Sequence, residues 1–338
     1  MKVAFIVTQY HNPRASGVLK QARNWKRSLE ALGVTVELMD PWKAVDWRKD
    51  FDLIHIFSGS YWASHLVADL MREGIPVLHS PILDTAKNLL LYRLTSFAPL
   101  FGHKLYTMPA VQKRYGKLCT YTLARSRDEF NILHRGIGLP ASKIRFIPIG
   151  MRPSVEPEVA VDLGALRNKR WCLHVSQYTQ DRKNLVRLAA ACGRANISLV
   201  VCGDAGSERL KEEIKNKIGG RADCLFLDFV PASNLTWLYR NCHVFALPSL
   251  YEGVGLSALE AAYYGSPVVA SKIGGTRDYL KEYAFYADPY SEDEILEAIH
   301  NALNATRNEG MALYIKENFT DVAVADNLLN LYRDAVAD

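Results

Sequence analysis

PSLYEGVGLSALEAAYYGSPVVAS, residues 248–271, gives the clearest indication of the architecture of this chain. The apolar run VFALPS, which leads into it, predicts a buried strand that ends in a turn at Pro248. A loop with two glycines, Gly253 and Gly255, follows and allows backbone geometry that other residues avoid. A helix is expected from about Ser257 to Tyr264, and a second apolar strand over residues 267–270. The stretch therefore predicts a β-loop-α-β unit.

Two glutamates in this stretch suggest a ligand site. Glu252 lies in the glycine loop, and Glu260 lies eight residues later on the predicted helix. Glycines at a strand-to-helix turn let backbone N–H groups approach a phosphate, and the helix N-terminus favours negative charge. A carboxylate on the helix can then accept from the two hydroxyls of a ribose. The alternative is that both glutamates are solvated, as most are. Glu260 stands in a segment that is otherwise uncharged from Gly253 to Ser271, which favours the ligand site.

Length and composition indicate a two-domain globular protein. The chain has 338 residues, of which 49% are hydrophobic and 23% are charged, as in ordinary globular proteins. No apolar run is long enough for a transmembrane helix, and the N-terminus is expected to be a strand and not a signal peptide. The six cysteines show no metal-ligand spacing, so we interpret them as reduced core thiols of a cytosolic protein.

The net charge of +5 is unevenly distributed along the chain. Residues 1–150 carry 21 lysines and arginines against 11 aspartates and glutamates, whereas the remainder carries 20 against 25. A basic first half beside a mildly acidic second half indicates different partners for the two. We expect an anionic acceptor or a membrane surface for the first half.

The pattern P-S-x-x-E-G-x-G-L-x-x-L-E-A-x-x-x-G-x-P-V-V, with Glu252 and Glu260 in place, closely resembles the signature of retaining GT-B glycosyltransferases of family 4, the glycosyl transferases group 1. The resemblance implies an α/β fold of the GT-B type, with two Rossmann-like doubly wound domains facing a central cleft. The expected parts are an acceptor-binding domain at 1–150, a linker at 151–168, a nucleotide-sugar-binding domain at 169–318 and a helix at 319–338 that crosses back toward the first domain.

The resemblance also implies roles for individual residues on the donor side. Glu252 and Lys183 are the expected catalytic residues: Lys183 meets the donor diphosphate, and Glu252 holds hydroxyls of the transferred sugar. Glu260 is expected to hold the ribose. Gln177 stands where the family usually has an arginine, so a neutral amide replaces a charge. The expected donor-binding residues are Glu260, Lys183, Arg182, Gln177, Gly253, Val254, Gly255, Leu256, Asp228 and Gly203.

The acceptor side is expected at the strand ends of the first domain. The candidate residues there are Gly17, Arg14, His79 and Asp84. The family often has a histidine after a Ser-Pro turn, and Ile82 occupies that place here. His79 has a structural alternative, because a histidine within a strand is more often a core residue than a ligand.

Residues 87–117 interleave lysines and arginines with aromatic residues. Such a segment can lie on an anionic membrane with its rings at the interface. The alternative is an ordinary pair of amphipathic helices whose aromatic residues belong to the core. No nucleic-acid-binding motif accompanies the segment, so we expect no nucleic-acid partner.

The expected function is therefore transfer of a hexose-type sugar, with retention, from a nucleotide-diphosphate donor to a polysaccharide or glycolipid acceptor. A UDP-sugar is favoured over a GDP-sugar, and neither a metal nor another cofactor is expected. The expected location is the cytoplasm, with peripheral contact at the inner face of the membrane. The alternatives are a non-catalytic nucleotide-sugar-binding GT-B protein and a GT-B phosphorylase or epimerase. Turnover of the donor and analysis of its products separate them.

Overall fold

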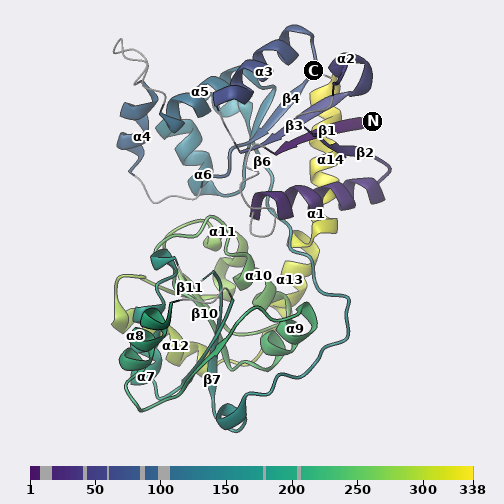
Figure 1. Cartoon of the computed structure of the whole chain (residues 1–338). Helices are drawn as coiled ribbons and strands as arrows, with labels where there is room; N and C mark the ends of the chain where they lie inside the picture. The colour runs from purple at the N-terminus through teal and green to yellow at the C-terminus, as the bar shows by residue number, and fades with distance from the viewer. Residues whose placement is uncertain are drawn as a thin grey trace. The chain divides into compact units, whose positions relative to one another are not determined.

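The fold consists of two α/β units. The computed structural model describes residues 1–7, 17–40, 44–58, 61–83, 88–97, 107–177, 180–203 and 207–337. Unit 1 comprises Met1–Gly150 and Asp321–Asp338, and unit 2 comprises Met151–Thr320. Residues 151–168, expected as a linker, thus fall within unit 2, and the last helix of the chain falls within unit 1. Figure 1 shows the elements of each unit.

Unit 1 is built on a parallel sheet of six strands among the described residues, in the order β2-β1-β3-β4-β5-β6. The strands are β1 (Lys2–Val7), β2 (Thr35–Leu38), β3 (Leu53–Phe57), β4 (Val77–Ser80), β5 (Tyr121–Ala124) and β6 (Ile144–Phe146). The helices are α1 (Gly17–Ala31), α2 (Trp47–Asp50), α3 (Tyr61–Arg72), α4 (Leu89–Ser96), α5 (Met108–Leu118), α6 (Arg127–Asn131) and α14 (Asp321–Ala337), with a π-helical segment at Ile132–Ile137 and a 3₁₀ turn at Ala141–Lys143.

Both faces of the unit 1 sheet are buried, as expected for parallel strands. Along β1, Val3 and Phe5 belong to the core cluster that includes side chains of α1 and α14. Ala4 and Ile6 belong to the opposite cluster, which includes side chains of α3 and α5. This alternation follows from the two-residue period of a strand. Figure 1 shows α14 beside α1 within unit 1.

Unit 2 is built on a second parallel sheet, in the order β12-β11-β10-β7-β8-β9. Its strands are β7 (Trp171–Val175), β8 (Ser198–Cys202), β9 (Cys224–Leu227), β10 (Val244–Leu247), β11 (Val268–Ser271) and β12 (Phe285–Ala287). Its helices are α7 (Leu185–Arg194), α8 (Glu208–Ile218), α9 (Ala232–Asn241), α10 (Leu256–Tyr263), α11 (Thr276–Leu280), α12 (Glu292–Asn304) and α13 (Glu309–Phe319), with 3₁₀ turns at Gly164–Leu166, Asp181–Lys183 and Lys281–Tyr283.

The strand order of unit 2 is that of a Rossmann-type doubly wound sheet, with the order reversing between β7 and β10. The β-loop-α-β unit predicted from residues 248–271 is β10, α10 and β11. The helix begins at Leu256 and ends at Tyr263, one residue earlier at each end than predicted.

The basic-aromatic segment 87–117 contains α4 and α5. Tyr92 and Tyr115 are buried, so these two rings belong to the core of unit 1, as the amphipathic-helix alternative predicts. Phe97 is 40% exposed, and the Lys113 ammonium lies 3.6 Å from the centre of its ring. No helix among the described residues has both the length and the apolar character to cross a membrane.

Three histidines at strand positions are fully buried: His55, His79 and His174. Burial lowers the pKa of each to about 3, and the neighbouring His79 also lowers the pKa of His55. His55 is held by Tyr332 of α14, 2.6 Å from Nδ1, and by the Ser80 hydroxyl, 2.8 Å from Nε2. The three rings therefore stay neutral in the folded protein throughout the physiological pH range.

We predict that acid destabilises the protein through these histidines. The unfolded chain binds protons near pH 6.5 and the folded chain only near pH 3, so stability present at pH 7 is lost as the pH falls through this window. The loss reaches about 1.4 kcal/mol per pH unit for each histidine. Urea unfolding at pH 7 and pH 5 measures it. His79→Gln should reduce the pH dependence, whereas His300→Gln, at an exposed position, should not. Equal pH dependence in both variants would contradict this assignment.

Candidate functional site

The candidate site lies at the carboxyl ends of β7 and β10 in unit 2. These strands are neighbours, with Val244 opposite Cys172 and Phe245 opposite Leu173. The strand order reverses between them. In open α/β sheets the loops at such a reversal diverge and leave a crevice where ligands bind. Residues 176–184 follow β7, and residues 248–255 follow β10.

A carboxylate shared between these two loops is the centre of the site. Lys183 donates to Glu252 Oε1 at 2.5 Å, and the Ser249 hydroxyl donates to the same oxygen at 2.8 Å. Arg182 Nη1 lies 3.4 Å from Glu252 Oε2. Glu252 is 7% exposed and Lys183 is 9% exposed. Two cations share one carboxylate, so the cluster keeps a net positive charge at a partly desolvated position.

Asn184 fastens the two loops to each other. Its backbone is left-handed, with φ 62°, which asparagine tolerates better than most residues. Its Nδ2 donates to the Pro248 carbonyl at 2.9 Å and to the Pro289 carbonyl at 2.6 Å. The Leu250 N–H donates to the Arg182 carbonyl at 2.8 Å. The bonds to Pro248 and Leu250 hold the loop that carries Lys183 against the loop that carries Glu252.

Two glycines permit the close backbone approaches around Glu252. Gly274 has φ 100°, and a Cβ there would lie 2.2 Å from the Glu252 carbonyl oxygen. Gly255, the N-cap of α10, has φ 78°. No side chain caps the N-terminus of α10, so its first N–H groups remain available to an anion. Gly253 and Val254 are buried, and Leu256 begins the helix with 37% exposure.

Glu260 lies on the second turn of α10 and is oriented by Tyr239 of α9. The Tyr239 hydroxyl donates to Glu260 Oε2 at 2.8 Å. Burial raises the pKa of Tyr239 well above its ordinary value, and the charge of Glu260 raises it further. The phenol therefore keeps its proton and remains a donor to the carboxylate.

His174 supports the site from within the sheet. Its Nδ1 lies 2.8 Å from the Ala246 carbonyl and its Nε2 lies 2.7 Å from the Ser176 hydroxyl. Burial is the main cause of its lowered pKa, and the Lys183 charge lowers it further. The neutral ring bridges β7 and β10 beneath the two loops.

The remaining predicted donor-side residues lie at the same edge of the sheet. Gln177 follows β7, is exposed, and accepts from Gln180 Nε2 at 3.3 Å. Gly203 follows β8 and donates to the Leu227 carbonyl at 3.2 Å. Asp228 follows β9 and is exposed. The structure thus brings Glu252, Lys183 and Arg182 into direct contact, and places the other three at the ends of neighbouring strands.

Sequence reasoning did not name three residues that shape the site: Ser249, Tyr239 and His174. Ser249 lies inside the 248–271 pattern, three residues before Glu252. The pattern could therefore have identified it as a site residue. Tyr239 lies 21 residues before Glu260 on another helix. Nothing in its local sequence marks it, since its role arises only from tertiary packing.

The predicted acceptor-side residues that the structure describes, Gly17 and His79, lie in unit 1. Gly17 begins α1. His79 lies in the core, stacked on Tyr115 at 4.6 Å between ring centres, and neither ring nitrogen has a hydrogen-bond partner. Ile82, which replaces the family's histidine, has φ 56°, a strained conformation for a β-branched residue. Arg14 and Asp84 lie outside the described residues.

Comparison with known proteins agrees with this geometry. Residues 162–319, nearly all of unit 2, match the family described as glycosyl transferases group 1. Unit 2 is therefore similar to glycosyl transferases group 1 domains over residues 162–319. Over a longer span, which includes most of unit 1, the chain is 26% identical to a D-inositol 3-phosphate glycosyltransferase of Rhodococcus erythropolis. The match extends over 313 residues, which is 85% of this chain and 69% of that protein.

Other relatives match over shorter spans. An uncharacterized glycosyltransferase of Methanocaldococcus jannaschii is 26% identical over 218 residues, which is 58% of this chain and 55% of the archaeal protein. The chain thus spans little more than half the length of that relative, and 37% of a D-inositol 3-phosphate glycosyltransferase of Corynebacterium glutamicum.

Solved structures share the fold over the whole chain. Sucrose-phosphate synthase from Thermosynechococcus elongatus superposes with a TM-score of 0.76 at 19% identity, covering 100% of both chains. Anabaena HepE in complex with UDP superposes with a TM-score of 0.74 at 17% identity, covering 99% of this chain and 100% of that one. The fold of the protein is therefore GT-B, as the sequence predicted.

We predict that Glu252→Gln destabilises unit 2. The variant leaves the Lys183 ammonium buried beside a neutral amide, which should lower the free energy of unfolding by about 3 kcal/mol. Urea unfolding measures this change. The double variant Glu252→Gln with Lys183→Met should recover most of the loss, because it removes both charges.

The matched control is Asp69→Asn, which breaks an exposed ion pair with Arg72 whose side chains are 63% and 78% exposed. Its effect should stay below about 1 kcal/mol. If Glu252→Gln lowers the free energy of unfolding by no more than this control does, the Lys183–Glu252 pair is not desolvated as described.

Proposed function

We propose that the protein transfers a hexose, with retention of configuration, from a nucleotide-diphosphate sugar to a hydroxyl of a polysaccharide or glycolipid acceptor. A UDP-sugar is the proposed donor ahead of a GDP-sugar. The observation that carries the proposal is the contact of Lys183 and Arg182 with Glu252 at the reversal of the unit 2 sheet, beside the uncapped N-terminus of α10.

This arrangement matches the electrostatic need of the reaction. A negative charge develops on the diphosphate as the glycosidic bond breaks, and fixed positive groups stabilise it. In the proposed complex, Lys183, Arg182 and the helix N–H groups meet the diphosphate. Glu252 accepts from hydroxyls of the transferred sugar, and Glu260 accepts from the ribose hydroxyls. No metal or other cofactor has a role in this scheme.

The proposed chemical step exchanges one bond for another at the anomeric carbon. The bond from that carbon to the β-phosphate oxygen breaks, and the bond to the acceptor hydroxyl oxygen forms on the same face. The leaving phosphate takes the hydroxyl proton. We assign no nucleophile from the protein, because the front-side reaction implied by the family resemblance needs none.

The preference for UDP is supported by one structural neighbour, which was solved in two complexes. Anabaena HepE was solved in complex with UDP and in complex with UDP-glucose, with TM-scores of 0.74 and 0.72 to this chain. Both share the fold at 17% identity, so the base and the sugar remain part of the proposal.

An anionic membrane is the proposed partner of α4 and α5. On α4, Leu90 and Leu94 are each 62% exposed, and Phe97, the C-cap of the helix, is 40% exposed. Burial lowers the pKa of Lys113, and the charges of Lys117 and Arg93 lower it further. No aspartate or glutamate lies between Asp84 and Asp128 in the sequence. Exposed apolar side chains beside uncompensated positive charge are typical of a peripheral membrane surface.

A non-catalytic nucleotide-sugar-binding protein is the second candidate, and Gln177 favours it. Its exposed neutral side chain bonds Gln180 and supplies no charge to a diphosphate. Release of free nucleotide from a UDP-sugar by the purified protein would exclude this candidate. Binding without turnover across a panel of acceptors would favour it.

The first measurement is a thermal-shift screen against UDP, GDP, ADP, CDP and dTDP with their common sugars. A ligand that binds only the folded state raises the melting temperature. We expect the UDP series to give the largest shift. A shift from none of these ligands would contradict the proposed donor site.

We predict that Glu260→Gln and Lys183→Ala each weaken binding of the donor, by about tenfold or more, since each removes a charged contact worth about 1.4 kcal/mol or more. Isothermal titration with the best nucleotide-sugar measures the change. Lys272→Ala is the control, because it removes a unit 2 lysine that pairs with Glu294 on the protein surface. Parental affinity and turnover in both site variants would show that the donor site is misplaced.

We predict a separate role for Tyr239 in orienting Glu260. Tyr239→Phe removes the hydroxyl that bonds this carboxylate, so KM for the donor should rise about threefold to tenfold while kcat stays close to the parental value. Steady-state kinetics measure both constants. Tyr264→Phe, which removes a neighbouring hydroxyl that bonds Thr236 instead, should leave KM unchanged. A fall in kcat with constant KM would contradict a positioning role.

A further inference from the structure

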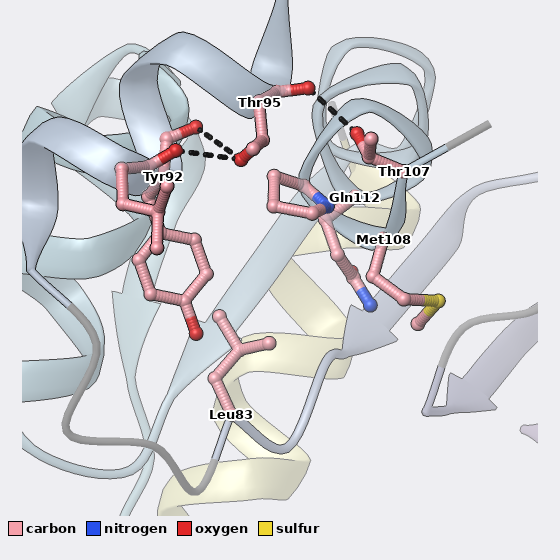
Figure 2. A pocket seen from close by; sticks show the side chains of 8 residues that line it. Leu83, Tyr92, Thr95, Thr107, Met108 and Gln112 are labelled. Atoms are coloured by element: carbon pink, nitrogen blue, oxygen red, sulfur yellow. Dashed lines mark hydrogen bonds between the residues drawn. The ribbon is translucent and has the colours of Figure 1, made fainter. Parts of the chain in front are cut away.

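A pocket of about 350 Å³ lies between α4 and α5 in unit 1. Its apolar wall is formed by Leu83, Leu91, Met108 and Pro109 (Figure 2). Leu83 follows β4, so the pocket lies beyond the carboxyl end of that strand, the edge at which open parallel sheets bind ligands. We call it the α4–α5 pocket. Its lining belongs entirely to unit 1, whereas Glu252 and Lys183 belong to unit 2.

The pocket is supported by a buried ionic pair. The Leu83 N–H donates to Glu129 Oε1 at 2.7 Å. The same carboxylate accepts from Arg125 Nε at 2.9 Å and from Arg125 Nη2 at 3.0 Å. Glu129 is 1% exposed and Arg125 is 6% exposed. The backbone at Leu83 is therefore held in place before any ligand arrives.

Gln112 of α5 gives the pocket an unused polar group. It is 2% exposed, and neither Oε1 nor Nε2 has a hydrogen-bond partner. Figure 2 shows the amide end pointing into the space between Leu83 and Met108. A buried amide without partners destabilises the folded state. A hydroxyl satisfies both of its atoms, since it can donate to Oε1 and accept from Nε2.

Two threonines add acceptors but no free donors. The Thr95 hydroxyl donates to the Leu91 carbonyl at 2.7 Å, and the Thr107 hydroxyl donates to the Thr95 carbonyl at 2.6 Å. Figure 2 draws these bonds as dashed lines. The lining thus combines apolar walls with a few polar atoms, which is typical of sites for small neutral ligands.

An apolar strip on α4 leads to the pocket. Leu90 and Leu94 are each 62% exposed and lie four residues apart, so they share one face of the helix. Leu91 is 48% exposed and also lines the pocket. The strip and the pocket together offer a hydrocarbon surface that continues into a polar-tipped cavity.

We propose that the α4–α5 pocket binds the hydroxylated head of an amphiphilic glycoside or polyol, whose hydrocarbon chain lies along Leu91, Leu94 and Leu90. The head hydroxyl completes the hydrogen bonds of Gln112. This inference rests on the proposed function only for the fate of the ligand, which becomes the acceptor of the transferred sugar. The binding itself is testable without turnover.

The test uses the full chain and two probes with the same octyl chain. Octyl β-glucoside, below its critical micelle concentration, carries ring hydroxyls, whereas an octyl sulfobetaine carries none. Isothermal titration gives both affinities, and free glucose gives the contribution of the head alone. We expect tight binding of the glucoside, weaker binding of the sulfobetaine and the weakest binding of glucose.

Three variants distinguish recognition of the ligand's hydroxylated head from recognition of its hydrocarbon chain. Gln112→Met keeps the side-chain length, and should weaken glucoside binding about fivefold, the effect of one ordinary hydrogen bond, without changing sulfobetaine binding. It should also raise the melting temperature of the free protein, because it removes an unsatisfied buried amide. Leu94→Ser should weaken both octyl probes. Leu313→Ser, at a 54% exposed position of unit 2, should weaken neither.

Equal affinity of the parent protein for both octyl probes would overturn the proposal. A Gln112→Met variant that still binds the glucoside more tightly than the sulfobetaine, by the same factor as the parent, would overturn it as well. The nucleotide thermal shift and donor turnover are measured on the same samples. If these persist while glucoside binding is absent, only this inference fails. If glucoside binding is present while no nucleotide binds, the proposed function fails instead.

Discussion

The pairing of β7 with β10 determines the geometry of the candidate site in unit 2. The chain leaves β7, builds β8 and β9 on one side, and returns to place β10 on the other side of β7. Residues that are 69 positions apart in sequence, Lys183 and Glu252, thereby reach hydrogen-bond distance. Parallel strands make this possible because their carboxyl ends meet at one edge of the sheet.

The buried carboxylate of Glu252 then organises the loops around it. Desolvation makes an unpaired charge costly, so the sequence supplies a lysine, an arginine and a serine hydroxyl as partners. The same partners preorganise the site, because their positions are set before a ligand binds. In the proposed complex a diphosphate competes with Glu252 for the two cations, and the excess of one positive charge favours the anion.

Local sequence patterns predicted the frame of this site better than its details. The strand predicted over residues 267–270 is β11, shifted by one residue, because strands buried on both faces are nearly continuous apolar runs. The 248–271 pattern placed Glu252 and Glu260 on their loop and helix. The contact of Tyr239 with Glu260 was not predictable, since it depends on how α9 packs on α10. The lack of partners for His79 was likewise invisible, because the sequence alone does not show which nitrogens find partners.

The two units differ in how completely they satisfy buried polar atoms. Among the described residues, Gln21, Trp25, His79, Gln112 and Thr122 each keep a buried side-chain nitrogen or oxygen without a hydrogen-bond partner, and all five belong to unit 1. Buried polar atoms that find no hydrogen-bond partner destabilise the folded state. Unit 2, by contrast, surrounds the Glu252 carboxylate with partners. Of these five residues, Gln112 alone lines the α4–α5 pocket, so its amide is the one that the proposed ligand can satisfy.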